Sequence, residues 1–393
     1  MKKSYLMIAA AATLFAACSS NEIKNDVKDF SNPAITFSTY ASYQTKAAEN
    51  STATTKWDLE DHHTSFDVWA WKYYNSAWVS EAVYNKGTVT YSSNAWAASP
   101  IRFWDKSAEK YYFYAAAPSN DAWTLNNNDT STDYSDDYLT YANFTLAGTN
   151  INSTDYTQSF SSVADVDLMI AEDNEVLRAK YNKSTPDVVN ELFDHILSRL
   201  NVTVALKAGG SLVTNNATVK VTNFAITGVN LKNKGSFNEN ADLGTDVLAN
   251  GTIKRWSSLD INGASYNLSG KDISNTALTT TALYIAQYLI IPQSITSEVL
   301  DRANGLVDTD NDEVGDDDAS HPYFVISYTI NNEPFTAYYN LANAFGVAAD
   351  GTLAFNEGWQ NTLNIKLDAD IITFDPQVYE WANGNDHDVT IED

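Results

Sequence analysis

The feature that most restricts the fold of this chain is a series of short runs, from Trp57 onward, in which apolar and polar residues alternate. Successive side chains of a strand point to opposite faces, so this periodicity indicates strands. The run SFDVWAWKYY, for example, places Phe66 and Val68 on one face and Trp69 and Trp71 on the other. Asn, Asp, Ser and Gly separate the runs, as expected for turns. The sequence therefore predicts an all-β protein.

Composition and charge narrow the possible functions. A chain of 393 residues with 44% hydrophobic residues can fill two cores. Its 23 Tyr, 16 Phe and 10 Trp residues favour strands, and a single cysteine argues against disulfides and thiolate metal sites. The formal net charge of -26 repels phosphate backbones and anionic lipid headgroups. Nucleic acid is therefore not expected as a partner.

The N-terminus has the layout of an export signal. Lys2 and Lys3 precede an apolar stretch over residues 5–17 that is too short to span a bilayer. Cys18, the only cysteine, stands where a bacterial lipoprotein signal places its lipidated residue, although Phe15 replaces the preferred Leu. An ordinary secretory signal is the alternative. We expect a signal peptide over 1–17, lipidation at Cys18, a tether over 18–34 and anchoring to the outer membrane.

A change of periodicity marks the expected domain boundary. The linker-like sequence KSTPD contains Pro186, and Phe193, Ile196 and Leu200 then recur at helical spacing before the alternation returns. We expect an N-terminal domain over residues 35–186 and a C-terminal domain over 187–393. A short helix or turn is expected near the start of the second domain.

No catalytic motif stands out in the sequence. It contains no His-Glu-x-x-His pair, nucleophile elbow, phosphate loop or dinucleotide fingerprint. His62 and His63 are expected to be a solvated pair, and His195 a hydrogen-bonded structural residue. Because the chain has 50 acidic residues, neighbouring carboxylates identify no glycosidase pair. We expect no enzymatic activity.

The acidic run DTDNDEVGDDD makes calcium a candidate cofactor. Its aspartates have the alternate spacing with which a loop can wrap oxygen ligands around calcium. Glu313 stands where the calcium loop needs Gly, and Ala319 where a bidentate Glu would close the shell. A solvated acidic loop is the alternative. The candidate ligands are Asp308, Asp310, Asp312 and Asp316.

Several motifs follow one another in a fixed order along nearly the whole chain. They are the lipoprotein start, ITFST, IRFW with YYFYAAAP, DVDLMIA, FDHILSRLNVTV, YLIIPQ and the closing ITFDPQVYEW. In this succession the chain resembles the fimbrillin family, the lipoprotein-derived type V pilins. The resemblance implies two tandem transthyretin-like (Greek-key) β-sandwich domains. It also implies assembly with other fimbrial subunits into surface fimbriae that support adhesion to host or bacterial surfaces.

The resemblance further implies a role for the first strand. In the family, a protease with Arg or Lys preference cuts behind this strand, which leaves and is replaced by a strand of the next subunit. Lys46, where family members commonly carry Arg, is the first candidate cleavage site, and Lys56 is the second. The alternating residues of the removable strand are Ile35, Phe37, Thr39, Ala41 and Tyr43.

The donor strand is expected from the C-terminal region. The run NTLNIKLDADIITF is amphipathic, although an ordinary internal strand of a sandwich has the same pattern. The residues on its apolar face are Leu363, Ile365, Leu367, Ala369 and Ile371.

A rival function comes from the tryptophans. Exposed indole rings could stack on sugars, which would make the chain a glycan-binding surface lipoprotein, whereas core packing is the ordinary role of aromatics in strands. The residues in question are Trp69, Trp71, Trp78, Trp96 and Trp104. A hydrolase is disfavoured because no nucleophile or metal cluster stands out.

Overall fold

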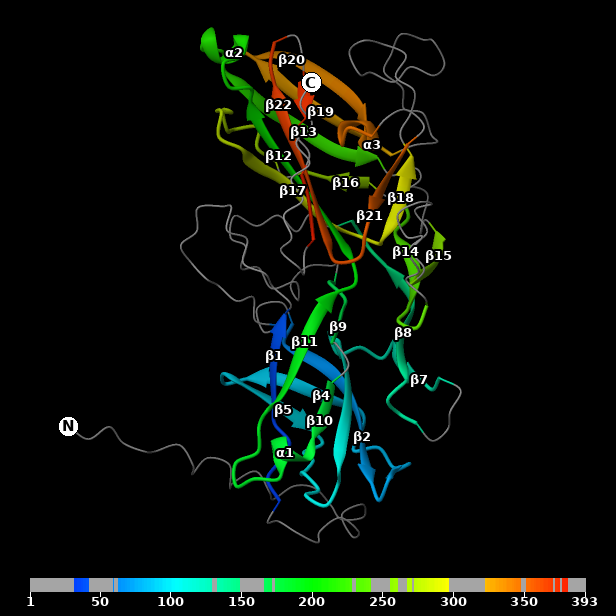
Figure 1. The fold of residues 1–393 in the computed structure, drawn as a ribbon. Coiled ribbons are helices and arrows are strands. Elements are labelled where there is room, and N and C mark those ends of the chain that lie inside the picture. Colours follow the sequence, from blue (N-terminus) through cyan, green and yellow to red (C-terminus); the bar gives the residue numbers. More distant parts are fainter. Residues whose placement is uncertain are drawn as a thin grey trace, which may run out of the picture.

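Strands make up nearly all of the regular structure in the computed structural model (Figure 1). Its three described helices have four residues each: α1 (Arg178–Tyr181), α2 (Ser211–Thr214) and α3 (Leu341–Ala344). The expected all-β fold is therefore confirmed. The structure describes residues 32–41, 59, 63–128, 133–148, 166–171, 174–227, 231–241, 255–260, 267–270, 272–296, 322–347, 351–369, 372–374 and 377–380.

The lower half of the molecule in Figure 1 is built from one sheet of nine strands. In spatial order they are β10 (Asn174–Leu177), β6 (Lys110–Ala117), β9 (Met169–Ala171), β11 (Val189–His195), β1 (Phe37–Ala41), β5 (Ala95–Ser99), β4 (Tyr84–Ser92), β2 (Ser65–Tyr74) and β3 (Ala77–Trp78). Strands β2 and β6 also pair with each other over seven residue pairs, from Asp67–Ala116 to Tyr73–Lys110. The sheet thus closes on itself as a barrel of seven strands, β6-β9-β11-β1-β5-β4-β2, with β10 and β3 attached.

Alternation along β2 explains how this barrel is filled and covered. Phe66, Val68 and Ala70 face the interior, where they join a cluster that includes Phe113. The intervening Trp69 and Trp71 face outward and belong to a second cluster. Both sets are buried, so the strand is apolar on both faces because each face meets a different layer.

The layer over the outer face is a sheet of four strands drawn from both halves of the sequence. It consists of β15 (Trp256–Asp260), β14 (Lys234–Asn238), β8 (Tyr138–Thr145) and β7 (Trp123–Asn126). Aromatic rings from three of these strands meet edge to face, as in Trp123–Tyr141 at 4.9 Å and Trp123–Phe237 at 6.3 Å. The pairing of β8 with β14 ties the N-terminal half to the C-terminal half.

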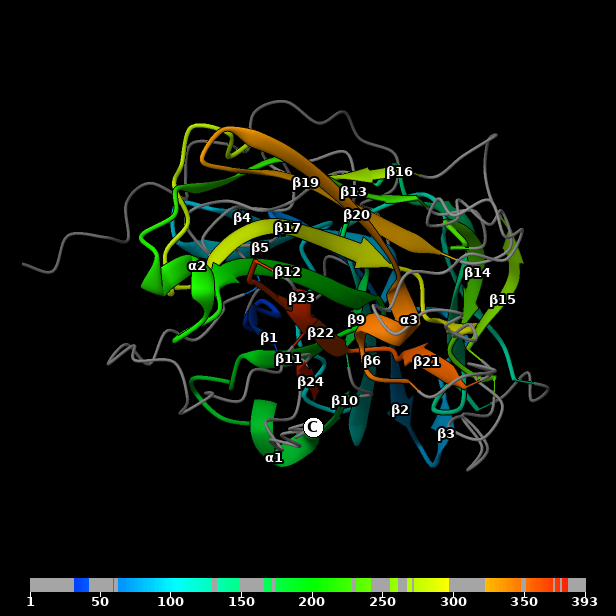
Figure 2. The ribbon, with the colours of Figure 1, turned by 90° about the horizontal axis from the view of Figure 1, so that it is seen from above.

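The upper half contains two larger sheets packed face to face, as the view from above shows (Figure 2). One sheet contains β17 (Leu283–Ile290), β12 (Ser198–Leu206), β22 (Trp359–Leu367), β23 (Ile372–Phe374) and β24 (Gln377–Glu380). The other contains β16 (Asn267–Ser269), β13 (Val219–Thr227), β19 (Tyr323–Ile330) and β20 (Glu333–Asn340). A two-stranded pair, β18 (Gln293–Thr296) and β21 (Thr352–Phe355), lies beside them.

The helical spacing after Pro186 does not produce a helix. Residues 189–195 form β11 and residues 198–206 form β12, so the expected strand is present as β12, whereas the short helix that was one of the two expected connections is absent. Val189, Glu191, Phe193 and His195 are buried while the residues between them are not, which is the period of a strand. Strand β11 belongs to the barrel and β12 to the upper half, so the chain leaves the barrel between His195 and Ser198.

A buried polar cluster closes the barrel where β11 ends. His63 Nε2 donates to the backbone carbonyl of Asp167 at 2.7 Å, and His195 Nδ1 donates to Asp167 Oδ2 at 2.7 Å. All three side chains are at most 5% exposed. The structural role expected for His195 agrees with this, whereas the solvated state expected for His63 is wrong. His62 lies outside the described residues.

This cluster predicts a fall in stability on acidification. Burial lowers the pKa of His63 to about 4, with partial compensation from Asp167 and a further lowering by His195. The unfolded chain takes up this proton near pH 6.5, so stability is complete above pH 6.5 and falls by up to about 3 kcal/mol as the pH drops to 4. Urea denaturation between pH 7 and 4.5 measures this slope. The His63→Gln variant should show a shallower slope than the wild type, and equal slopes would contradict the assignment.

Candidate assembly site

The first strand fills a gap in the barrel wall. Strand β1 pairs in parallel with β11 over five residue pairs, from Phe37–Val189 to Ala41–Phe193. On its other side it pairs with β5 only through Phe37 and Trp96. Removing β1 would leave two strand edges, β11 and β5, with unpaired backbone groups facing each other. We call this gap the β1 seat.

Two side chains of this segment complete the interior of the barrel. Ile35 and Phe37 are 4% and 5% exposed. The ring of Phe37 contacts Phe66, Tyr84 and Phe113 edge to face, at centroid distances of 5.9, 5.9 and 6.0 Å. Burying each such side chain contributes about 1.5–3 kcal/mol. Of the strand expected from Ile35 to Tyr43, residues Phe37–Ala41 form β1, Ile35 is buried just before it, and Tyr43 lies outside the described residues.

The fit becomes poorer toward the end of the strand. Thr39 is 5% exposed, and its Oγ1 has no hydrogen-bond partner among the described residues. It pairs with Glu191, a fully buried carboxylate that faces the barrel interior from β11. An unsatisfied buried hydroxyl costs about 1–3 kcal/mol. The β1 seat therefore has two apolar positions, filled by Ile35 and Phe37, and one polar position.

The chain enters the β1 seat from the lower end of the barrel. Ile35 N donates to Arg102 O at 2.8 Å, and Trp104 N donates to Pro33 O at 3.1 Å. On the opposite side Val189 N donates to Thr36 O at 2.8 Å. Residues 33–36 are consequently held between two segments of the barrel before β1 begins.

The candidate cleavage sites lie in the connection that follows β1. Lys46 and Lys56, together with Tyr43, fall in residues 42–58, outside the described residues. The connection begins where β1 ends, at Ala41, and its far end is fixed by Leu59, which is fully buried and whose carbonyl accepts from His63 N at 2.7 Å. A cut at either lysine would thus separate β1 from the barrel, while Leu59, beyond the cut, would remain buried in the barrel.

The expected donor residues occupy the middle of a sheet. Leu363, Ile365 and Leu367 are at most 1% exposed and lie in β22, which pairs with β12 over eight residue pairs. On its other edge β22 pairs with β23 and β24. Ala369 is exposed beyond the end of β22, and Ile371 lies outside the described residues. Their position is that of an internal strand and the segment that follows it.

Other predicted sites fall outside the described residues. These are Cys18 and the acidic residues Asp308, Asp310, Asp312 and Asp316. Within the described part of the chain, no group of three or more His, Cys, Asp or Glu residues could hold a metal ion. The same residues contain no helix that is both long and apolar enough to cross a membrane.

The five tryptophans named as possible sugar platforms do not form an exposed row. Trp69, Trp71 and Trp104 are 3%, 8% and 0% exposed, while Trp78 and Trp96 are half-buried. Trp96 packs against the barrel core and Trp78 against the outer cluster. These five side chains pack as core aromatics, so they do not offer the exposed indole rings that a glycan-binding surface would need.

The sequence reasoning missed the residues that line the β1 seat. Val189, Glu191 and Phe193 face the barrel interior from β11, the strand to which β1 is bonded over its whole length. Their alternation was present in VVNELFDH, but the helical spacing of the apolar residues that follow obscured it.

The polar position yields a prediction. Thr39→Val removes the unsatisfied hydroxyl while keeping the branched shape, and should raise the free energy of unfolding by about 1–3 kcal/mol. Thr36→Val is the matched control, because Thr36 is exposed on the same segment and should change stability by about 0.5 kcal/mol or less. Phe37→Ala should lower stability by about 3–5 kcal/mol. Chemical denaturation measures all three, and a neutral or destabilising Thr39→Val would contradict the assignment.

The chain is similar to known proteins over most of its length. The family described as fimbrillin-like matches residues 45–381, beginning just beyond β1. Fimbrium subunit Fim1C of Phocaeicola vulgatus is 24% identical over 423 residues, covering 99% of this chain and 99% of that protein.

Two solved structures show weaker likeness. A fimbrial protein from Bacteroides vulgatus has a TM-score of 0.46 and 14% identity over 88% of this chain and 99% of that chain. The tip fimbrial protein Mfa3 from Porphyromonas gingivalis, with a C-terminal truncation, has a TM-score of 0.37 and 9% identity over 89% and 100%. Because the family match covers most of the sequence, this chain belongs to the fimbrillin-like family.

Proposed function

We propose that the chain is a structural subunit of a surface fimbria, assembled by exchange of its first strand for a strand of the next subunit. Membership of the fimbrillin-like family and the likeness to a fimbrium subunit support the fimbrial role. The observation that carries the exchange is the β1 seat, in which one short strand closes a barrel that is otherwise complete. The proposal includes no enzymatic activity and no cofactor, and it places the subunit in a fimbrium at the cell surface.

The energetics of the β1 seat suit a replaceable strand. Backbone pairing to β11 and burial of Ile35 and Phe37 hold β1 in place before cleavage. The single pair with β5 and the unsatisfied Thr39 hydroxyl leave room for a better-fitting strand. Strand addition takes affinity from backbone hydrogen bonds and specificity from alternate side chains, so a longer strand with an apolar third position would displace β1.

Export as a lipoprotein completes the proposal. The layout of residues 1–17 and Cys18 supports a lipid anchor on the outer membrane for the precursor. We also infer two domains that meet between β11 and β12, where the sheets change, a little beyond the boundary expected at residue 186. The transthyretin-like topology and adhesion to host or bacterial surfaces remain predictions from the family resemblance.

We infer that the strand donated to the next subunit comes from the edge of the sheet that contains β12 and β22, and not from its centre. Releasing β22 would break its eight pairs with β12 and expose Leu363, Ile365 and Leu367. Strands β23 and β24 pair with β22 alone, through three and four residue pairs along one edge. Detaching them leaves the pairing of β12 with β22 intact, so residues from Ile372 onward can be offered to a neighbour at lower cost.

Cleavage is tested with the purified full chain and a trypsin-like protease. Treatment should release the segment that contains β1 and convert monomers to higher oligomers, measured by N-terminal sequencing and size-exclusion chromatography. The Lys46→Ala and Lys56→Ala variants identify the site that matters, and Lys46→Arg should become sensitive to an Arg-specific protease. Lys220→Ala, in the other half, is the matched control. A double Lys46→Ala, Lys56→Ala variant that still oligomerises after treatment would overturn this assignment.

The donor is tested by ending the chain after Ala369. Because β22 keeps its pairing with β12, the truncated chain should fold and be cleaved like the wild type, yet form no oligomers by itself. Mixed with wild-type chains it should accept a strand and shorten the polymers, as seen by light scattering. Polymers of the truncated chain alone would show that the donor lies elsewhere, with β22 as the next candidate.

A further inference from the structure

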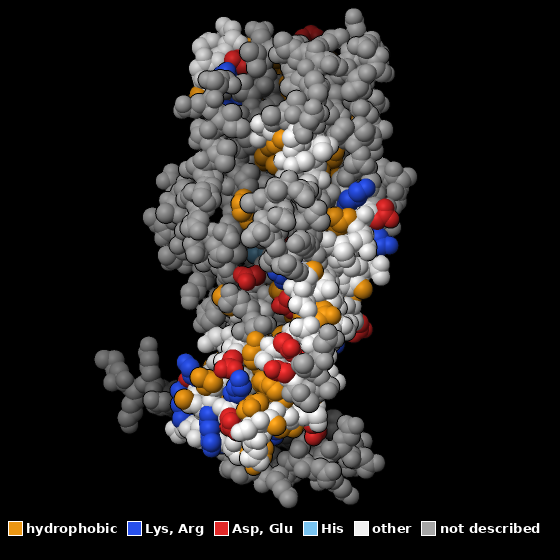
Figure 3. Space-filling view, turned by 45° about the vertical axis from the view of Figure 1, so that its right-hand side comes forward, with side chains coloured by type: hydrophobic (Ala, Val, Ile, Leu, Met, Phe, Trp, Pro, Cys, Tyr) orange, Lys and Arg blue, Asp and Glu red, His pale blue; other side chains and the backbone are white. Residues whose placement is uncertain are grey.

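Exposed apolar side chains gather at one end of the barrel. Among the described residues six large hydrophobic side chains are exposed, and only Phe335, at 44%, lies in the upper half. The other five lie where strands begin or end at the lower end, and we call them the basal rim: Tyr74, Ile101, Phe103, Leu177 and Val188, exposed by 40–59%. On the face in Figure 3, hydrophobic side chains lie together with Lys or Arg and Asp or Glu side chains at this end.

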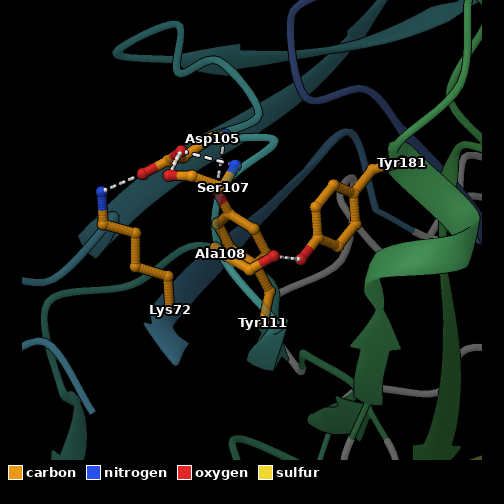
Figure 4. Close-up of polar contacts among 6 residues, drawn as sticks. All are labelled: Lys72, Asp105, Ser107, Ala108, Tyr111 and Tyr181. Carbon is orange, nitrogen blue, oxygen red and sulfur yellow. Dashed lines mark hydrogen bonds and ion pairs between the residues drawn. The ribbon is translucent and has the colours of Figure 1, made fainter. Parts of the chain in front are cut away.

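The basal rim is a rigid surface, not a set of loose loops. Figure 4 shows the bonds beneath it: Tyr181 Oη donates to Ala108 O at 2.8 Å, and Asp105 N donates to Tyr111 Oη at 2.6 Å. The ring of Trp104 stacks on Tyr181 at 4.7 Å. These contacts join the segment that carries Phe103 to helix α1, which follows Leu177, so the rim is formed before any partner arrives.

Cations surround the apolar residues although the chain as a whole is acidic. Lys106, Arg178 and Lys180 lie in the two segments that carry the rim, and no ion pair joins any of them to a described carboxylate. Lys110 and Lys183 are paired, with Glu175 at 2.5 Å and Asp187 at 2.6 Å. Residues 101–110 and 174–188 together contain six basic residues and four acidic ones, Asp105, Glu109, Glu175 and Asp187, so this end carries a small excess of positive charge beside its apolar side chains.

The chain reaches the β1 seat through this same surface. Pro33 and Ile35 are hydrogen bonded to the segment between Ile101 and Trp104, and Thr36 to Val189 beside Val188. Residues 19–31 separate the rim from Cys18 in the sequence, and thirteen residues can span at most about 45 Å when fully extended. A lipid on Cys18 would therefore hold the basal rim close to the bilayer.

We propose that the basal rim of the precursor lies against an anionic lipid surface, with its apolar side chains in the headgroup region and its cations on the lipid phosphates. This rests on the lipid anchor in the proposed function. The net charge of -26 opposes adsorption of the whole protein. Screening limits the range of charges to about 8 Å, however, so a tethered molecule responds to the charges that face the membrane. Apolar and aromatic residues flanked by Lys and Arg are typical of interfacial contact.

The test labels lysine side chains of the full-length protein with an amine-reactive reagent and reads each site by mass spectrometry. The protein is compared in detergent, on phosphatidylcholine vesicles and on phosphatidylcholine–phosphatidylglycerol vesicles. Lys106 and Lys180 should lose reactivity several-fold on the anionic vesicles, whereas Lys207 and Lys220 in the upper half should not change. The mass of the N-terminal peptide reports the lipid in the same samples.

Matched variants separate the rim from the tether. Phe103→Ser with Leu177→Ser should abolish the protection, and Phe335→Ser, of nearly equal exposure at 44%, should keep it. Since these side chains are exposed, all variants should fold, and oligomerisation after proteolysis should be the same in each. That assay decides the proposed function independently of the rim.

Each outcome is decisive. Lysine protection on vesicles that the rim variant loses, in protein whose N-terminal peptide carries the lipid, supports the proposal. Equal reactivity of the lipidated protein on vesicles and in detergent overturns it, even where oligomerisation proceeds. Protection in vesicle-free, detergent-free buffer that increases with protein concentration also overturns it, because the rim would then face a second copy of this chain.

Discussion

The structure depends on the closure of the barrel by β1. A sheet that closes on itself has no edges, and here closure requires a strand of five residues between β11 and β5. The same strand supplies Phe37 to the centre of an aromatic cluster, so backbone pairing and side-chain burial at one place hold the N-terminal half together. The proposed assembly depends on the connection between β1 and the remainder of the barrel, which contains Lys46 and Lys56.

The aromatic residues have different tasks on the two sides of the barrel wall. Inside, Phe66 and Phe113 surround Phe37, whereas outside, Trp69 and Trp71 are covered by the sheet that contains β7, β8, β14 and β15. That sheet takes strands from both halves of the chain. The outer layer therefore links the barrel to the upper half, and loss of β1 can open the inner cluster while this link remains.

Placement of the rim and of the β1 seat at one end has a mechanical consequence. The chain passes from the basal rim into the β1 seat, so the segment that would carry the proposed lipid anchor is also the segment that the proposed cleavage would remove. One proteolytic cut would release β1, the tether and the contact with the membrane together. The unsatisfied hydroxyl of Thr39 is compatible with the proposed exchange, because a strand that is to be replaced needs no perfect fit.

The sequence by itself determined the strands, their faces and the family. The alternation around Phe66 reappears in the structure because the period of a strand is a local property. The prediction of a short helix after Pro186 failed because the apolar residues Phe193, Ile196 and Leu200 recur at helical spacing although the segment forms strands. Pairing with β1, more than 140 residues earlier in the sequence, favours the strand in β11. Barrel closure, the burial of Glu191 beside Thr39 and the gathering of Phe103 with Leu177 were decided only by the tertiary structure. Each joins residues distant in sequence, and pairing of this kind leaves no local periodicity to detect.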